Sequence, residues 1–305
     1  MGRSVVILGT EVEIKDYICS RDGGEYRRKP QNAKLQLVVT PTAYCDGHCP
    51  FCCAGDRDNR AAINLKHFER LLLELKEADI VRGVSFTGGE PFSDAGLLDA
   101  AINMVYDVFG FECEIAVNTN GTGLRQLDKI HNLEHIDAIH ISRHHYDDAL
   151  NRKLFGIDVP GEKELERIIR GIGIADLFVM NCLLLKDYIG TADSLCTYLE
   201  HAAGWGAGKA AFITPMGVNA YAESQAVDYR ELLKKGDGRF LFTRSYCDYN
   251  ICCCQDGVYV TQGGELIEFY GRTTRPGGCG YARGLNFGPD SILRAGYGGR
   301  EIVAF

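Results

Sequence analysis

The sequence has no hydrophobic run that approaches the roughly 20 residues of a membrane-spanning helix, and its N-terminus lacks the basic-then-apolar pattern of a signal peptide. Basic residues are outnumbered, with 33 Lys and Arg against 41 Asp and Glu, which gives a formal net charge of -8. A general nucleic-acid binder needs a broad excess of cations to displace phosphate counterions. We therefore expect a cytoplasmic protein with no membrane partner and no general nucleic-acid binding.

Cysteine, in contrast, is abundant, with 13 in 305 residues. Such a number would indicate disulfides in a short secreted chain, but this chain is long and carries no export signal. Reduced thiolates bound to metal, together with some buried free thiols, account better for it. We expect the isolated Cys53, Cys113, Cys182 and Cys196 to be buried small residues.

Three cysteines lie in the segment Cys45-Asp46-Gly47-His48-Cys49-Pro50-Phe51-Cys52, spaced C-x3-C-x2-C, just after an apolar run. Three thiolates on one short loop can hold three irons of a cubane cluster and leave the fourth iron without a protein ligand. A zinc ion is the alternative, but a structural zinc site normally has four protein ligands. Zinc would also leave the segment Thr87-Gly88-Gly89-Glu90-Pro91, about forty residues on, unexplained.

These two segments together resemble the signature of the radical S-adenosylmethionine (SAM) enzymes, including the aromatic Phe51 before the last cysteine. The resemblance implies a [4Fe-4S] cluster on Cys45, Cys49 and Cys52, with SAM bound at the open iron. It implies that one electron from the cluster breaks a carbon-sulfur bond of SAM to give a 5'-deoxyadenosyl radical. A flavodoxin- or ferredoxin-type electron donor is the expected partner.

From residue 35 onward, short β-prone runs alternate with helical patterns. The strands are predicted at 35–40, 84–86, 114–118, 138–142, 177–184 and 210–214. Parallel neighbours need long crossovers, so this order predicts an α/β fold with a parallel sheet and helices outside it. The resemblance implies the same fold, a partial (β/α)6 barrel over residues 35–220. Residues 1–34 are predicted to form an N-terminal strand pair, and 221–305 a small cysteine-rich C-terminal domain and tail.

The active site of such a sheet forms at the carboxyl ends of its strands. Gly88 and Gly89 follow the second strand, where a bare backbone can approach a ligand and accept from the ammonium group of SAM. Glu90 could add a carboxylate to that contact or bond to backbone. A plain turn that opens a helix is the alternative for this segment.

Further SAM contacts are implied by the resemblance at later strand ends, at Asn118, Asn120, Ser142, Arg143 and Asn181. Asn and Gly after the third strand could equally form a turn with positive φ. Alternation sends Ser142 and Arg143 to opposite faces of their strand, and a guanidinium suits the SAM carboxylate. The nearby His140, His144 and His145 are not assigned a role.

The C-terminal region contains Cys247, Cys252, Cys253, Cys254 and Cys279 around a predicted hairpin at 258–269. It looks like the shortened auxiliary-cluster domain of several radical SAM enzymes, which implies a second Fe-S cluster on Cys247, Cys252 and Cys279. Three consecutive cysteines in an extended segment cannot all face one site, because neighbours point to opposite sides. Cys253 or Cys254 could instead donate a hydrogen atom, as in radical epimerases. A zinc clip or plain structural thiols are the third possibility.

These observations predict a radical SAM enzyme that abstracts hydrogen from a ribosomally made peptide, to epimerise or cross-link it. A nucleotide or other small metabolite is the alternative substrate, favoured by a likeness to the GTP cyclase of molybdenum-cofactor synthesis and by the arginines of the C-terminal tail. A non-catalytic Fe-S or zinc-binding scaffold is a second alternative. Sequence alone does not name the substrate, because one fold serves many of them.

Overall fold

The computed structural model describes residues 2–15, 17–22, 25–30, 34–54, 57–246, 256–271, 284–296 and 299–305. The five C-terminal cysteines considered above, Cys247, Cys252, Cys253, Cys254 and Cys279, lie outside these residues. The alternatives for their roles therefore stay predictions.

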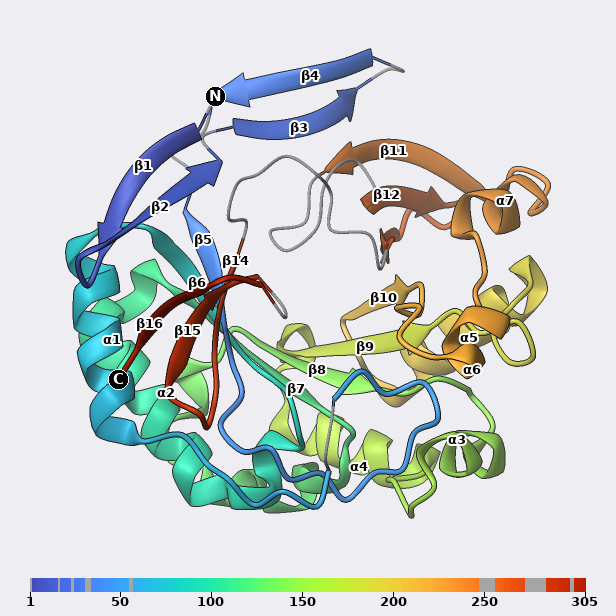
Figure 1. Cartoon of the computed structure of the whole chain (residues 1–305). Helices are drawn as coiled ribbons and strands as arrows, with labels where there is room; N and C mark the ends of the chain where they lie inside the picture. Colours follow the sequence, from blue (N-terminus) through green and yellow to red (C-terminus); the bar gives the residue numbers. More distant parts are fainter. Residues whose placement is uncertain are drawn as a thin grey trace.

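Six parallel strands form the centre of the fold, as the sequence predicts. They are β5 (Leu35–Val39), β6 (Val81–Phe86), β7 (Glu114–Thr119), β8 (Ala138–Ser142), β9 (Phe178–Leu183) and β10 (Lys209–Ile213). Each pairs in parallel with the next strand of the chain. The sheet curves into an open barrel with the helices on its convex side (Figure 1).

The longer helices are the crossovers between these strands: α1 (Leu65–Glu77), α2 (Ala95–Phe109), α4 (Glu162–Ile172) and α5 (Ala192–Trp205). Asn64 caps α1, because its side chain accepts from the backbone N–H groups of Lys66 and His67. Short 3-10 helices complete the crossovers: η1 (Pro91–Asp94), η2 (Gly110–Glu112), η3 (Thr122–Lys129), η4 (Leu133–His135) and η5 (Ala175–Leu177).

Three short helices are also present: α3 (Asp148–Phe155), α6 (Ala220–Ser224) and α7 (Tyr229–Lys234). The ends of α3 are set by its caps, because the Asp147 side chain accepts from Leu150 N and Gly156 adopts the left-handed conformation. In the part of the chain that is described, no helix is long and apolar enough to cross a membrane.

The region beyond residue 220 continues the same sheet on both sides of the six strands. β13 (Leu266–Tyr270) pairs in parallel with β10, and β14 (Gly284–Phe287) pairs in parallel with β5. Antiparallel strands then extend both edges: β11 (Phe240–Tyr246), β12 (Asp256–Thr261), β15 (Ile292–Ala295), β16 (Glu301–Ala304), β3 (Tyr17–Asp22) and β4 (Glu25–Pro30). In its described parts, the C-terminal region is thus built into the barrel sheet.

Within residues 1–34, β1 (Gly2–Ile7) and β2 (Thr10–Lys15) form a separate antiparallel sheet, whereas β3 and β4 belong to the large sheet. The pair of β1 and β2 lies beside the C-terminal strands, since Thr10 Oγ1 donates to the carbonyl of Ile302 in β16 at 3.1 Å.

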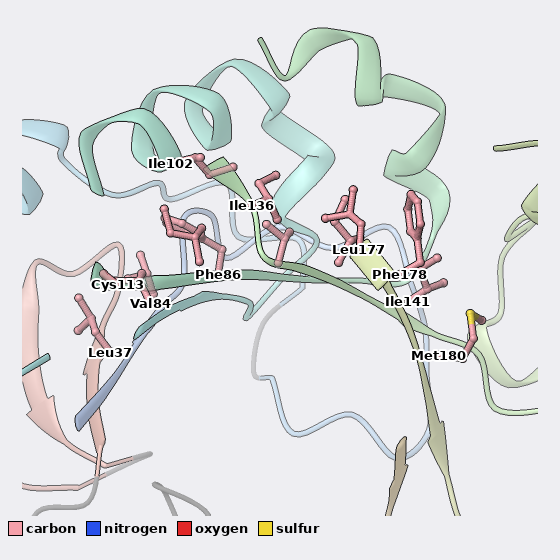
Figure 2. Close-up of a cluster of buried hydrophobic side chains, with 14 of the residues drawn as sticks. Leu37, Val84, Phe86, Ile102, Cys113, Ile136, Ile141, Leu177, Phe178 and Met180 are labelled. Atoms are coloured by element: carbon pink, nitrogen blue, oxygen red, sulfur yellow. The ribbon is translucent and has the colours of Figure 1, made fainter. Parts of the chain in front are cut away.

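The two faces of the parallel sheet differ in chemistry. Its convex face carries apolar side chains such as Leu37, Val84 and Ile141, which pack under the helices to form the core (Figure 2). Side chains alternate along a strand, so the residues between them face the concave side. There the partly exposed positions include Ser85, Asn118, His140, Ser142 and Asn181.

Candidate active site

The loop that carries the three cysteines is closed at its base by backbone hydrogen bonds. Ala43 N donates to Ala61 O, and Cys45 N donates to Arg57 O. Inside the loop, Cys52 N donates to Cys49 O at 3.2 Å, and Arg57 donates to Gly47 O at 2.9 Å. These bonds fix the backbone that presents Cys45, Cys49 and Cys52.

All three cysteine side chains are partly exposed on this one loop. Burial raises the pKa of Cys45 to about 11 and that of Cys49 to about 12. A thiolate without a bound cation is therefore unfavourable at both positions, and coordination to iron would provide the positive charge that favours it.

The spacing of the cysteines also bears on what they can bind. Within the described ranges, no three His, Cys, Asp or Glu side chains are grouped so that they could hold a single metal ion. In a cubane cluster each cysteine bonds to a different iron, so its three thiolates do not need to converge on one point. The donor set on this loop therefore fits such a cluster.

The glycine segment after β6 packs against the start of the cysteine loop. Gly89 N donates to Thr42 O at 3.3 Å, and Glu90 N donates to Tyr44 O at 2.8 Å. A Cβ at Gly89 would lie only 2.1 Å from Tyr44 O, so no larger residue fits here without a shift of the loop. Gly88, at φ +104°, needs the conformational freedom of glycine. Both glycines thus serve the contact between the two segments.

Glu90 is buried and bonds to protein groups. Its carboxylate accepts from Thr119 Oγ1 and Asn120 N, each at 2.7 Å, and from Phe92 N at 3.3 Å. Burial outweighs these bonds and raises the pKa of Glu90 to about 7. Of the two roles expected for Glu90, the structure contains the bonds to backbone, which tie the ends of β6 and β7 together.

Asn120 extends this network to the cysteine loop. Its Nδ2 donates to Asp46 Oδ1 at 2.6 Å, and its Oδ1 accepts from Thr122 N at 2.9 Å. Asp46 lies inside the cysteine motif, and we did not single it out from the sequence. The position of Asp46 between two motif cysteines was the available signal in the sequence. Its hydrogen-bond partner Asn120 could not be inferred, because it lies 74 positions away in the chain.

Arg143 does not lie where a SAM contact was expected. Its guanidinium is 1% exposed and bonds to Asp148 Oδ1 at 2.5 Å and to the carbonyls of Tyr146 and Pro160. It also stacks over the ring of Trp205 in α5, 4.5 Å from its centroid. The alternation of β8 explains this difference, because it directs Arg143 to the convex, helix-covered face and Ser142 to the concave one.

His144 and His145 also bond within the protein, His145 through its Nδ1, which accepts from Asp147 N at 2.8 Å. Burial lowers the pKa of His144 to about 3, and its Nδ1 accepts from Leu183 N at 3.1 Å. The His144 ring stacks on Phe155 of α3 and meets the edge of Phe51, with both centroid distances 5.0 Å. Since His48 N donates to Phe155 O at 2.7 Å, α3 supports the cysteine loop through Phe155.

The remaining predicted contacts lie on the concave face of neighbouring strands. Asn118 Nδ2 donates to Ser85 Oγ at 2.9 Å, and Asn181 Oδ1 lies 3.3 Å from His140 Nδ1. Ser142 and Asn181 are register partners in β8 and β9. The structure thus brings Asn118, Ser142 and Asn181 to one surface, beyond which the cysteine loop follows β5.

The other described cysteines outside the motif differ in burial. Cys113 and Cys182 are buried, as expected, and Cys113 belongs to the core shown in Figure 2. Cys196 is half-buried, with Arg239 Nη1 at 3.7 Å from its sulfur. Cys53 is exposed, so the expectation of burial was wrong there. It follows the turn at Cys52 on a surface loop, where no core is available to cover it.

The radical SAM superfamily model matches residues 39–188, which include the cysteine loop, the glycine segment and strands β6 to β9. The structure is similar to that of Streptococcus suis SuiB bound to its precursor peptide SuiA, with a TM-score of 0.61 and 17% identity over 86% of this chain and 59% of SuiB. SuiB bound to S-adenosylmethionine gives a TM-score of 0.59 and 18% identity over 86% of this chain and 60% of SuiB. This chain thus spans about three fifths of the length of SuiB, and the likeness concerns the fold.

A search of curated proteins with this sequence finds no match. The residues matched by the family model contain the three cysteines on a loop after the first barrel strand and the glycine segment after the second, which are held together by backbone hydrogen bonds. On these findings, the chain belongs to the radical SAM superfamily and is an enzyme of that superfamily.

Proposed function

We propose that this enzyme reductively cleaves SAM and abstracts a hydrogen atom from a ribosomally made peptide, with Cys45, Cys49 and Cys52 as the cluster ligands. Membership of the superfamily implies a [4Fe-4S] cluster and SAM as cofactors. When bound, they supply the electron and the 5'-deoxyadenosyl radical. The observation that carries the proposal is the backbone pairing of the cysteine loop with Gly89 and Glu90.

The protein groups around the proposed SAM site have separate tasks. Asn120 holds Asp46, and through it the cysteine loop, at the end of β7. Glu90 fixes the backbone of the glycine segment, so that the carbonyls of Gly88 and Gly89 are held in place to accept from the ammonium group of SAM. Asn118, Ser142 and Asn181 offer polar side chains to the rest of SAM from the concave face. Arg143 is left out of this set because protein groups surround it.

A peptide is favoured as the substrate over a nucleotide by the described part of the tail. Arg294 pairs with Asp290 at 2.7 Å and with Glu301 at 3.1 Å, and Arg300 donates to Glu11 O. Both arginines thus bond to protein groups, and they are not arranged around an anion. Arg275 and Arg283 lie outside the described residues. SuiB, whose fold is similar, is bound to a precursor peptide in its structure.

Deuterium transfer tests the substrate. The reduced enzyme is incubated with SAM and, in separate reactions, with candidate precursor peptides deuterated at the α-carbons and with deuterated nucleotides. We expect deuterium in the 5'-deoxyadenosine formed with a peptide. If deuterated nucleotides supply it and the peptides do not, the small-metabolite alternative is correct.

We also propose that Cys247, Cys252 and Cys279 hold an auxiliary cluster, with Cys253 or Cys254 left as a possible hydrogen-atom donor. The support is compositional, because these residues are outside the described part of the chain. Iron content tests the auxiliary cluster, because a second cubane would raise it from about four to about eight irons per chain.

A further inference from the structure

A second group of polar side chains lies on the concave face, beside the residues assigned to SAM. It consists of Glu268 and Tyr270 on β13 and of His140 on β8, which is separated from β13 by β9 and β10. Tyr270 donates its hydroxyl to Glu268 Oε2 at 2.5 Å. Burial lowers the pKa of His140, and the nearby charges of Glu268 and Lys209 act on it in opposite directions, Glu268 raising it and Lys209 lowering it.

Register places Glu268 in one row with the proposed SAM contacts. Ser142 pairs with Asn181, Asn181 with Ala211, and Ala211 with Glu268. Neighbouring strands are about 4.8 Å apart, so Glu268 lies two strands, or about 10 Å, beyond Asn181. Only the methyl group of Ala211 stands between them.

The orientation of this row follows from the aromatic residues next to it. Phe212 stacks on Phe269 at 5.4 Å, and Phe269 stacks on Tyr229 of α7 at 5.2 Å, so both phenylalanines face the helices. Side chains alternate along a strand. Ala211 and Glu268 therefore face the concave interior, and Glu268 is exposed there.

Glu268 forms no ion pair within the described part of the chain. No Lys or Arg among the described residues is within ion-pair distance of it; the cation on the same face of β10, Lys209, is two residues before its register partner Ala211. Burial lowers the pKa of His140, so this imidazole is neutral at pH 7 and adds no compensating charge. Among the described residues, the hydrogen-bond partner of this carboxylate is Tyr270, which leaves the carboxylate able to bind a cationic group of a ligand.

An apolar strip lies next to this carboxylate. Leu266, two residues before Glu268 on the same face of β13, is 61% exposed, and Leu241 of β11 is 56% exposed. The two are joined across the sheet by Val260, the register partner of both. A ligand seated on Glu268 would therefore meet leucine and valine side chains beside an anionic group.

We propose that Glu268, oriented by Tyr270, binds a cationic side chain of the substrate, and that the strip formed by Leu241, Val260 and Leu266 binds an apolar residue beside it. The ligand class is a peptide with a lysine or arginine next to a large aliphatic residue. This assignment rests on the proposed function, because it takes the substrate to be a peptide. Glu268 is thereby a specificity-determining residue and takes no part in SAM cleavage.

Binding of labelled peptides tests this assignment. The probes are three synthetic twelve-residue peptides that are identical except for a central Lys, Gln or Glu placed after a leucine. Fluorescence anisotropy is measured with the reconstituted enzyme in the presence of SAM. We expect the Lys peptide to bind at least tenfold more tightly than the Glu peptide, with a smaller ratio at high salt. Glu268→Gln should remove this preference, and Glu268→Lys should reverse it.

Glu265→Gln is the matched control, since Glu265 is an exposed carboxylate on the turn before the same strand. It should keep the wild-type preference. An equal affinity for the three peptides, or a preference that survives Glu268→Gln, would overturn the proposal.

Formation of 5'-deoxyadenosine under dithionite is followed in parallel without peptide. If 5'-deoxyadenosine formation is retained while no peptide shows the preference, the assignment of Glu268 as a cation-binding residue is wrong and the proposed radical chemistry is unaffected. If it is absent in the wild type, the proposed function itself fails.

Discussion

Replacement of Asp148 by Asn tests whether Arg143 belongs to the fold or to the SAM site. The Arg143 guanidinium is 1% exposed, and Asp148 is its one carboxylate partner among the described residues. Asn keeps the shape and one acceptor oxygen but removes the negative charge. A buried cation then loses its counterion, which costs about 3 to 5 kcal/mol when the pair is fully buried.

The expected loss is at the lower end of this range, about 3 kcal/mol, because the Asp148 side chain is 37% exposed. With about 2.1 cal/mol/K of unfolding entropy per residue, a chain of 305 residues loses about 1.6 °C of Tm per kcal/mol. Asp148→Asn should therefore lower Tm by about 5 °C, measured by circular dichroism under anaerobic conditions. The dissociation constant for SAM should stay within about threefold of wild type, a difference of less than 1 kcal/mol.

Asp158→Asn is the control for this measurement. Asp158 pairs with Arg152 at 2.8 Å near the same helix, but its side chain is 76% exposed. An exposed pair is worth about 0 to 1 kcal/mol, so Tm should change by less than about 2 °C. If Asp148→Asn leaves Tm unchanged and weakens SAM binding more than about tenfold, Arg143 faces the ligand and our assignment is wrong.

Two further predictions concern the site and its support. Gly89→Ala should abolish most 5'-deoxyadenosine formation, because the new Cβ would lie 2.1 Å from Tyr44 O. Gly96→Ala is the control and should leave this activity unchanged, because no heavy atom lies nearer than 3.8 Å to its Cβ. Equal activity of the two variants would contradict the contact between the glycine segment and the cysteine loop. Burial lowers the pKa of His144 from 6.5 to about 3, so the folded protein holds this imidazole neutral. The neutral imidazole therefore contributes fully to the free energy of unfolding above pH 6.5, and this contribution is lost as the pH falls toward 3. Over that range wild type should lose up to about 5 kcal/mol more than His144→Asn, in which Oδ1 can still accept from Leu183 N; parallel acid-unfolding curves would refute this.

Much of the fold could be predicted because its signals are local. The apolar face of α1 and the cap at Asn64 depend on neighbouring residues, and the six central strands are short apolar runs bounded by turns. The C-terminal strands β13 and β14 could not be placed, since their partners β10 and β5 are determined by long-range pairing. Alternation predicted that Ser142 and Arg143 face opposite ways, but not which face the helices cover.

The residues of the candidate site also differ in whether local sequence patterns can predict them. The cysteine motif and the glycine segment are short patterns, so their residues could be named from the sequence. The bond between Asp46 and Asn120 joins positions far apart in the chain and needs the assembled barrel. The row that ends at Glu268 depends on strand register across three strand pairs, which no local pattern encodes.

The central claim is that Cys45, Cys49 and Cys52 hold the cluster at which SAM is cleaved. Its most direct test is iron and acid-labile sulfide per chain after anaerobic reconstitution, for wild type, a triple alanine variant of these cysteines, and Cys53→Ala as the exposed control. We predict a loss of about four irons and of all 5'-deoxyadenosine formation in the triple variant alone. About eight irons in wild type would indicate the auxiliary cluster, and about four would leave the C-terminal cysteines as hydrogen-atom donors or structural thiols. Unchanged iron content and undiminished 5'-deoxyadenosine formation in the triple variant would contradict the account.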